Sequence, residues 1–232
     1  MMVDPAARII NKETWGPYFL LVLESRSIAR RAWPGQFVMV KASETTAPLL
    51  RRPLSLAGRN GDRFQLFFQV AGQGTALLAQ KEPEDRLDVI GPLGRGFRLP
   101  QNNQTAGVNI LVGVGRGIAP LLFLAGEMRA VHFPVKVLYG GRTAADLPLR
   151  DRLRAGDIPH ACSTDDGSFG QKGLVTGLLA QELKTKGAAG GIYACGPEPM
   201  LKTVAELAAS ARLPAQLSLE SHMGCGFGAC WG

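Results

Sequence analysis

The chain has 232 residues, of which 46% are hydrophobic and 19% are charged. This composition excludes a disordered chain, and the length exceeds the ~100–150 residues of a typical single-core domain, so two domains are predicted. The net charge of +7 comes from basic residues that stand singly or in pairs, which excludes the basic stripe of a nucleic-acid surface. No apolar run reaches the ~18–20 residues of a membrane span, and the first residues lack the order of a signal peptide, so we expect a cytoplasmic protein.

The first hundred residues have the pattern of short strands separated by turns. Phe, Val and Leu are concentrated in three segments, which span residues 18–24, 36–41 and 63–70. In the last segment Phe64, Leu66, Phe68 and Val70 alternate with Gln65, Phe67 and Gln69, as in a half-buried strand. Turns are expected at residues 33–35, 60–62 and 91–92, and a short helix at about 75–80. The pattern predicts a small antiparallel β-barrel over residues 1–100.

From residue 101 to residue 219 the pattern changes to alternating strands and helices. Apolar strands are expected at residues 109–114, 135–140 and 191–195. Helices are expected over residues 117–130 and from Pro197 onward, where Met200, Leu201 and Val204 mark an apolar face. This alternation predicts an α/β doubly wound parallel sheet that binds ligands at the carboxyl ends of its strands.

Two arginines open a predicted barrel strand at Arg51 and Arg52, directly before Pro53. A shielded guanidinium needs a carboxylate or phosphate partner, although an exposed edge strand, where Pro is tolerated, is an alternative explanation. The turn from Gly72 to Thr75 lies where a strand meets a helix, and its N–H groups favour a phosphate; by itself it is only a capped turn. Together the two features predict a pyrophosphate clamp. Asp88 is expected among the solvated charges of the barrel.

A second glycine cluster contains Gly113, Gly115 and Gly117, directly after a predicted strand and at the start of a helix. The context suits a dinucleotide, but Ile118 stands where the third glycine of G-x-G-x-x-G would fall. No acidic residue ends the next strand, which is followed by Arg142. An ordinary Rossmann NAD site is therefore not expected, and Arg142 leaves NADP open as an alternative.

Four cysteines are present, and two of them, Cys225 and Cys230, lie five positions apart among glycines. This crowding indicates metal chemistry rather than a disulfide framework, with flexible-tail thiols as the alternative. Cys162 is expected to be a core residue. The three histidines are scattered and suggest no metal site.

Arg52-Pro53-Leu54-Ser55 resembles the R-x-x-S motif of the ferredoxin-reductase-like flavoproteins, with Leu54 in place of the common tyrosine. Cys195-Gly196-Pro197 and Met200 resemble their C-G-P-x-P-M signature. The resemblance implies an antiparallel β-barrel FAD domain followed by an α/β doubly wound nicotinamide domain. It implies FAD contacts by Arg52, Pro53, Leu54, Ser55, Gln69, Val70, Gly72, Gly74 and Thr75, and nicotinamide-nucleotide contacts by Gly113, Gly115, Gly117, Pro120, Cys195 and Gly196.

The last residues, 220–232, resemble the cluster-binding segment of dihydroorotate dehydrogenase electron-transfer subunits, whose cysteines follow the plant-type spacing C-x4-C-x2-C. The resemblance implies that Cys225 and Cys230 ligate a 2Fe–2S cluster. We expect further cysteines beyond Gly232, and no stable cluster on these 232 residues alone. The resemblance also implies a catalytic dihydroorotate dehydrogenase subunit as partner, in pyrimidine biosynthesis.

The three implied cofactors differ in how many electrons they transfer at a time. A nicotinamide delivers two electrons as hydride and an iron–sulfur cluster accepts one at a time, so a flavin is needed as converter. The expected activity is therefore electron transfer among NAD(H), FAD and a 2Fe–2S cluster. One alternative is a flavin subunit of a sulfhydrogenase or of a ferredoxin-NADP transhydrogenase complex. Another is a nonenzymatic regulatory subunit whose nucleotide sites are vestigial.

Overall fold

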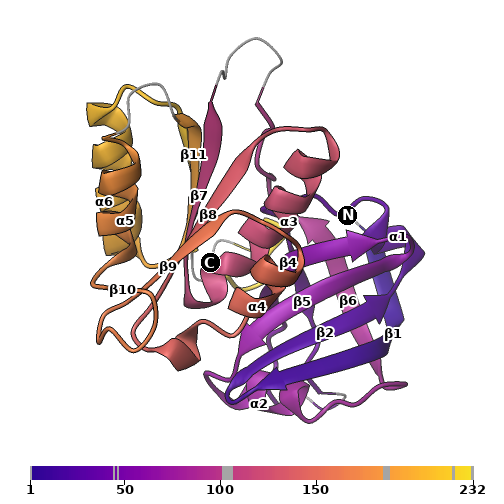
Figure 1. The fold of residues 1–232 in the computed structure, drawn as a ribbon. Coiled ribbons are helices and arrows are strands. Elements are labelled where there is room, and N and C mark those ends of the chain that lie inside the picture. Colours follow the sequence, from indigo (N-terminus) through magenta and orange to yellow (C-terminus); the bar gives the residue numbers. More distant parts are fainter. Residues whose placement is uncertain are drawn as a thin grey trace. The chain divides into compact units, whose positions relative to one another are not determined.

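A computed structural model of the protein describes residues 2–43, 45, 47–100, 107–184, 189–220 and 223–230 (Figure 1). The chain divides into two compact units. The first, here called the barrel unit, comprises Met1–Phe97 and Glu220–Gly232; the second, the sheet unit, comprises Arg98–Leu219. No helix in the described part of the chain has the length and apolar character needed to cross a membrane.

The barrel unit is a closed barrel of six antiparallel strands in the order β1-β2-β5-β4-β3-β6. The strands are β1 (Met2–Trp15), β2 (Tyr18–Glu24), β3 (Phe37–Val40), β4 (Arg52–Asn60), β5 (Arg63–Gln69) and β6 (Arg86–Leu93). Two short helices, α1 (Arg26–Ala29) and α2 (Gln73–Ala79), lie between strands along the chain. Phe64, Leu66 and Phe68 are buried in the barrel as the alternation predicts, but Phe67 on the opposite face is buried too, at 3% exposed, and Val70 lies beyond the end of β5.

One expected turn is not a turn. Gly91 and Pro92 lie inside β6, where Gly91 pairs with Met2 of β1. A Cβ atom at Gly91 would stand 2.6 Å from Cγ1 of Val38, so glycine permits a close approach of β3 and β6. The β3–β6 register also shifts between Phe37 and Met39, and Pro is tolerated at such irregular positions.

The sheet unit contains six parallel strands in the order β10-β9-β8-β7-β11-β12. They are β7 (Val108–Val114), β8 (Val135–Gly141), β9 (His160–Thr164), β10 (Gln171–Lys172), β11 (Ala189–Cys195) and β12 (Ala215–Ser218). The helices are α3 (Ile118–Ala130), α4 (Arg150–Ala155), α5 (Val175–Glu182) and α6 (Glu198–Ser210), with short 3-10 turns η1 (Gly115–Gly117) and η2 (Ala144–Asp146). The predicted barrel followed by a doubly wound sheet is confirmed.

The strand order creates a topological switch point in this sheet. After β7 the chain adds β8, β9 and β10 on one side, and then returns to place β11 on the other side of β7. Helices α5 and α6 lie together over one face (Figure 1), where Leu178 and Val204 pack with Val112 of β7 and Ala194 of β11. Ligands of open α/β sheets bind where the order reverses, at the carboxyl ends of the strands. Here that place is the end of β7 beside the end of β11.

Candidate functional site

Strands β4 and β5 pair along only part of their length. Their shared ladder covers residues 56–60 of β4 and 63–66 of β5. Beyond it, β4 extends back to Arg52 paired with β3 alone, and β5 extends to Gln69 paired with β2 alone. One edge of each strand therefore lacks a ladder partner at this end, which leaves backbone groups available to a ligand. The predicted flavin segments, 52–55 and 69–70, lie at these two edges.

Arg52 lies against the first turn of α2. A Cβ atom at Gly74 would overlap Nε of Arg52 and stand 2.9 Å from its Cζ, so glycine is what lets the guanidinium reach this backbone. The first helical hydrogen bond runs from the N–H of Ala76 to the oxygen of Gly72, so the helix does not use the N–H groups of residues 73–75. A guanidinium beside unused N–H groups is suited to a phosphate.

The Thr75 hydroxyl forms hydrogen bonds within this turn. Its Oγ1 accepts hydrogen bonds from the N–H groups of Ala71 at 2.9 Å and Gly72 at 3.2 Å, and donates to the oxygen of Gly72 at 3.0 Å. What Thr75 offers to an anion is therefore its backbone N–H rather than its side chain.

The two adjacent arginines have different partners. Arg51 forms an ion pair with Asp88 and also donates to the backbone oxygen of Asp88 at 2.9 Å. Each of these side chains is only 23% exposed, so Asp88 is not the solvated charge that the sequence suggested. Arg52 donates to the backbone oxygens of Leu50 and Arg51, and no carboxylate in the described part of the chain pairs with it. In the described part of the chain, no carboxylate therefore competes with an anion for the Arg52 guanidinium.

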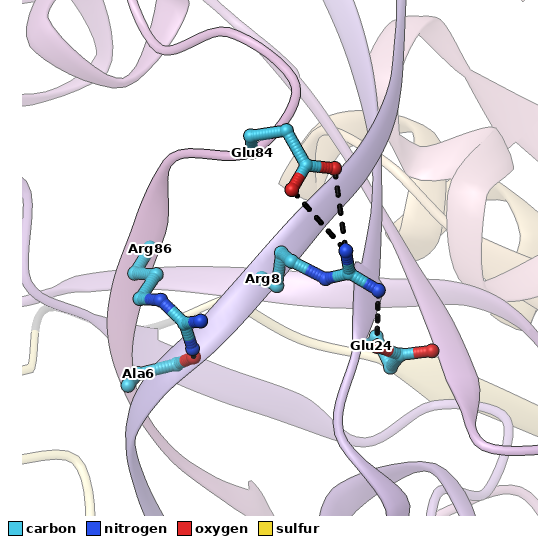
Figure 2. Close-up of polar contacts among 5 residues, drawn as sticks. All are labelled: Ala6, Arg8, Glu24, Glu84 and Arg86. Carbon is cyan, nitrogen blue, oxygen red and sulfur yellow. Dashed lines mark hydrogen bonds and ion pairs between the residues drawn. The ribbon is translucent and has the colours of Figure 1, made fainter.

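Unlike Arg52, Arg8 on β1 is paired with carboxylates of the same barrel (Figure 2). Its Nη2 donates to Glu24 at 2.8 Å, and its Nη1 donates to both carboxylate oxygens of Glu84, at 3.3 and 3.2 Å. Beside it, Arg86 donates to the backbone oxygen of Ala6 at 3.2 Å. These bonds tie β1 to β2 and to the loop before β6, so the Arg8 charge is neutralised within the protein.

The other residues of the flavin segments differ in exposure. Leu54 is 8% exposed and belongs to the barrel core, so its side chain does not replace the aromatic ring that commonly stacks on a flavin. Pro53 is exposed at the β4 edge that lacks β5, where a missing N–H costs no ladder hydrogen bond. Ser55, Gln69 and Val70 are half-buried at the same end of the strands.

In the sheet unit, the turn after β7 packs directly against the end of β11. A Cβ atom at Gly117 would overlap the carbonyl oxygen of Cys195 and stand 2.7 Å from its carbonyl carbon. Cys195 itself is 3% exposed. The structure therefore brings together Gly117, Cys195 and Gly196, which lie almost eighty positions apart in the sequence, at the switch point of the sheet.

The other predicted nucleotide residues have distinct roles around this contact. Gly115 has a φ of 54°, and a Cβ there would meet no atom within 4 Å, so its backbone is open to a ligand. At Gly113 a Cβ would stand 3.1 Å from Cα of Ile118, which makes this glycine a packing residue between β7 and α3. Pro120 is buried in the first turn of α3, where its missing N–H breaks no helical bond.

The carboxyl ends of β8 and β9 carry charges of both signs. Arg142, 80% exposed, pairs weakly with Asp146 at 3.7 Å. The N–H groups of Asp165 and Asp166 donate to the oxygens of Gly141 and Arg142, which places the two acidic residues at the same edge of the sheet as Arg142. Asp166 accepts hydrogen bonds from the hydroxyl and the backbone N–H of Ser168, which lower its pKa. The acidic pair thus forms a turn rather than a general-acid site.

The two C-terminal cysteines face each other across a tight loop. Sγ of Cys225 accepts hydrogen bonds from the N–H groups of Ala229 at 3.2 Å and Cys230 at 3.4 Å, and Sγ of Cys230 accepts one from the N–H of Cys225 at 3.2 Å. Gly226 and Gly228 have φ values of 78° and 83°, which let the backbone wrap around the sulfurs. Among the described residues no group of three or more metal-ligating side chains is present, so the loop offers two ligands.

These bonds predict an acidic thiol. The N–H of Phe227, the Cys230 side chain and the N–H of Cys230 lower the pKa of Cys225 to about 6. Because the thiolate is the reactive form, we expect alkylation of Cys225 by iodoacetamide in the metal-free chain to accelerate as the pH rises through about 6. Burial raises the pKa of Cys162, which stays unreactive. Peptide mapping after alkylation at several pH values measures the reactivity of both thiols. If the alkylation rate of Cys225 reaches half its maximum only at the pKa of an ordinary thiol, the hydrogen bonds of the loop do not stabilise its thiolate.

The chain is similar to known oxidoreductases over most of its length. Residues 111–206 match the family model of the oxidoreductase NAD-binding domain. The chain is 40% identical over 99% of its length to the dihydroorotate dehydrogenase B (NAD(+)) electron transfer subunit of Bacillus caldolyticus, covering 86% of that protein. It is 39% identical over 91% of its length to the corresponding subunit of Desulforamulus reducens, covering 80% of it.

Among solved structures, a chain of the NADH-dependent reduced ferredoxin-NADP oxidoreductase is 28% identical, with a TM-score of 0.84 over 98% of this chain and 80% of that one. The ferredoxin NADP+ reductase of Neisseria gonorrhoeae, solved with FAD and NADP, is 19% identical and shares the fold, with a TM-score of 0.75 over 94% of this chain and 99% of that one.

Proposed function

The chain belongs to the family of dihydroorotate dehydrogenase B (NAD(+)) electron transfer subunits, and from this premise we propose that it passes electrons between NAD(H), bound FAD and a catalytic dihydroorotate dehydrogenase subunit in pyrimidine biosynthesis. The observation that carries the proposal is the position of Arg52, uncompensated by any carboxylate among the described residues, over the unused N–H groups at the start of α2.

In this proposal the barrel unit binds the FAD. Arg52 and the N–H groups of Gly74 and Thr75 hold the pyrophosphate, while the open edges of β4 and β5, with Ser55 and Gln69, border the ring system. FAD supplies the conversion between two-electron hydride transfer and one-electron steps. The protein's part is to bind and orient it, since hydride transfer requires no acid or base from the chain.

The sheet unit binds the nicotinamide nucleotide at its switch point. The open backbone at Gly115 admits the dinucleotide, and the contact between Gly117 and Cys195 fixes the two loops that border it. We assign residues 1–100 to flavin binding and residues 101–219 to nucleotide binding.

Residues 220–232 are proposed to begin the segment that binds a 2Fe–2S cluster. Hydrogen bonds from N–H groups to both sulfurs favour thiolates, the form in which cysteine ligates iron. Such a cluster takes four ligands, and Cys225 and Cys230 supply two of them.

Anaerobic mixing of the purified flavoprotein with NADH tests the proposed function. The chain is expected to purify with FAD bound, and NADH is expected to bleach the flavin absorbance. A colourless chain that takes up no FAD would instead support a nonenzymatic subunit with vestigial nucleotide sites.

The similarity to the NADH-dependent reduced ferredoxin-NADP oxidoreductase, together with the exposed Arg142, favours a transhydrogenase-type flavin subunit as second candidate. The two candidates differ in nucleotide preference. Because Asp165 and Asp166 stand at the same sheet edge as Arg142, the 2′-phosphate of NADPH would meet negative charge there. We expect NADH to reduce the flavin about tenfold faster than NADPH, or more. A preference for NADPH in the same stopped-flow assay would instead support the second candidate.

A further inference from the structure

The chain passes between the two units at Phe97–Arg98 and again at Leu219–Glu220. Connections between domains are usually exposed segments that make few contacts. At the first crossing, by contrast, the backbones of two consecutive residues are bound by side chains of different units. Each set of hydrogen bonds lies within one unit. Phe97 is held by the barrel unit and Arg98 by the sheet unit, so no residue between them is held by neither.

On the barrel side, the turn at Trp33 and Pro34 holds Phe97 by both of its peptide groups. The Phe97 N–H donates to the oxygen of Pro34 at 2.8 Å, and Nε1 of Trp33 donates to the oxygen of Phe97 at 2.7 Å. The Phe97 ring is 6% exposed, and a Cβ at Gly35 would stand 2.9 Å from it. Arg59 lies over the Trp33 ring, 5.7 Å from its centre, and donates to the oxygen of Ala32.

On the sheet side, one glutamine side chain holds Arg98 in the same manner. The Arg98 N–H donates to Oε1 of Gln216 at 2.9 Å, and Nε2 of Gln216 donates to the oxygen of Arg98 at 2.8 Å. The hydroxyl of Tyr193, which is in register with Gln216 on the neighbouring strand, donates to the same oxygen at 3.3 Å. Gln216 lies only three residues before Leu219, where the chain crosses a second time.

We propose that Trp33 and Gln216 are positioning residues for hydride transfer, because they fix the consecutive peptide groups through which the flavin-binding unit is joined to the nucleotide-binding unit. The inference rests on the proposed function. Hydride transfer requires the reacting atoms to approach within about 3–3.5 Å, and a misplacement of about 1 Å can cost a hundredfold in rate. A crossing that is clamped on both sides limits such misplacement.

The test is the variant Gln216→Ala, which removes both hydrogen bonds to Arg98. Deuterium exchange of the Arg98 amide is expected to accelerate. FAD content and the affinity of the flavin-free protein for NAD are expected to stay unchanged, while anaerobic flavin reduction by NADH slows by about ten- to a hundredfold. The charge-transfer absorbance between reduced flavin and NAD, which reports the stacking of the two rings, is expected to weaken in parallel.

Gln216→Glu keeps the acceptor for the Arg98 N–H but loses the donor to its oxygen, and an intermediate rate is expected. Trp33→Phe should slow reduction in the same way from the barrel side. The matched control is Gln181→Ala, at an exposed position on α5 in the same unit, which should match the parent chain.

The outcomes separate the inference from the function on which it rests. A parent chain that NADH does not reduce would overturn the proposed function. If the parent is reduced and Gln216→Ala is reduced at the same rate, the positioning role is wrong. The role is also wrong if NAD affinity falls as far as the rate does, because Gln216 would then act by maintaining the fold of the sheet unit.

Discussion

Replacing Arg52 with alanine is expected to weaken FAD binding by one to two orders of magnitude while the barrel stays folded. The guanidinium contacts the first turn of α2 and makes hydrogen bonds only to the backbone oxygens of Leu50 and Arg51, so its removal leaves no carboxylate unpaired in the described part of the chain. Loss of a charge-assisted contact to a phosphate costs ~1.5–3 kcal/mol, which corresponds to this change in affinity. Titration of the flavin-free protein with FAD measures it.

Two further variants sharpen this experiment. Arg52→Lys keeps the charge but loses the planar fork, so intermediate affinity is expected. Arg63→Ala is the control, because Arg63 is exposed at the opposite end of the β4–β5 ladder. FAD affinity equal to that of the parent in Arg52→Ala would refute the pyrophosphate assignment.

A methyl group at Gly117 is expected to slow reduction by NADH strongly without affecting FAD. The Cβ of Gly117→Ala would overlap the carbonyl oxygen of Cys195, so the turn after β7 and the end of β11 must separate at the switch point. We expect at least a hundredfold loss in the rate of flavin reduction, as for other displacements of about 1 Å in a reacting complex. The protein should remain yellow.

Gly126→Ala provides the matched control for this change. A Cβ at Gly126 meets no atom within 4 Å, and the position lies in the exposed part of α3, where alanine favours the helix by about 0.5–1 kcal/mol. This variant should be reduced by NADH at the parent rate. Parent-like reduction of Gly117→Ala would show that the turn after β7 does not border the nucleotide.

Periodicity was sufficient to predict the two-part fold. The spacing of apolar residues in β5 and the strand–helix alternation after residue 101 are local properties of the sequence. Local signals failed at Gly91 and Pro92, because a turn dipeptide inside β6 is permitted by its place beside Val38, a contact between distant segments. The bounds of β1 likewise depend on its pairing with both β2 and β6.

For single residues of the candidate site, local sequence signals were likewise insufficient to predict contacts between distant segments. The motif around Arg52 was visible in the sequence. That Arg51 has a carboxylate partner and Arg52 does not depends on Asp88, which lies on another strand. No local signal revealed it, because Asp88 alternates with the buried Leu87 and Val89 in β6, a pattern that predicts an outward-facing residue. The contact of Gly117 with Cys195 had no local signal either, since it arises from the order of strands in the sheet.

Electron transfer through the intact complex tests the central claim most directly. The chain is purified from its own cells together with its catalytic partner subunit, and dihydroorotate-dependent reduction of NAD+ is followed under anaerobic conditions. The complex is expected to reduce NAD+, the catalytic subunit alone is expected not to, and adding back the chain is expected to restore the activity. NAD+ reduction by the catalytic subunit alone, or a flavin on this chain that stays oxidised while dihydroorotate is consumed, would contradict the proposed function.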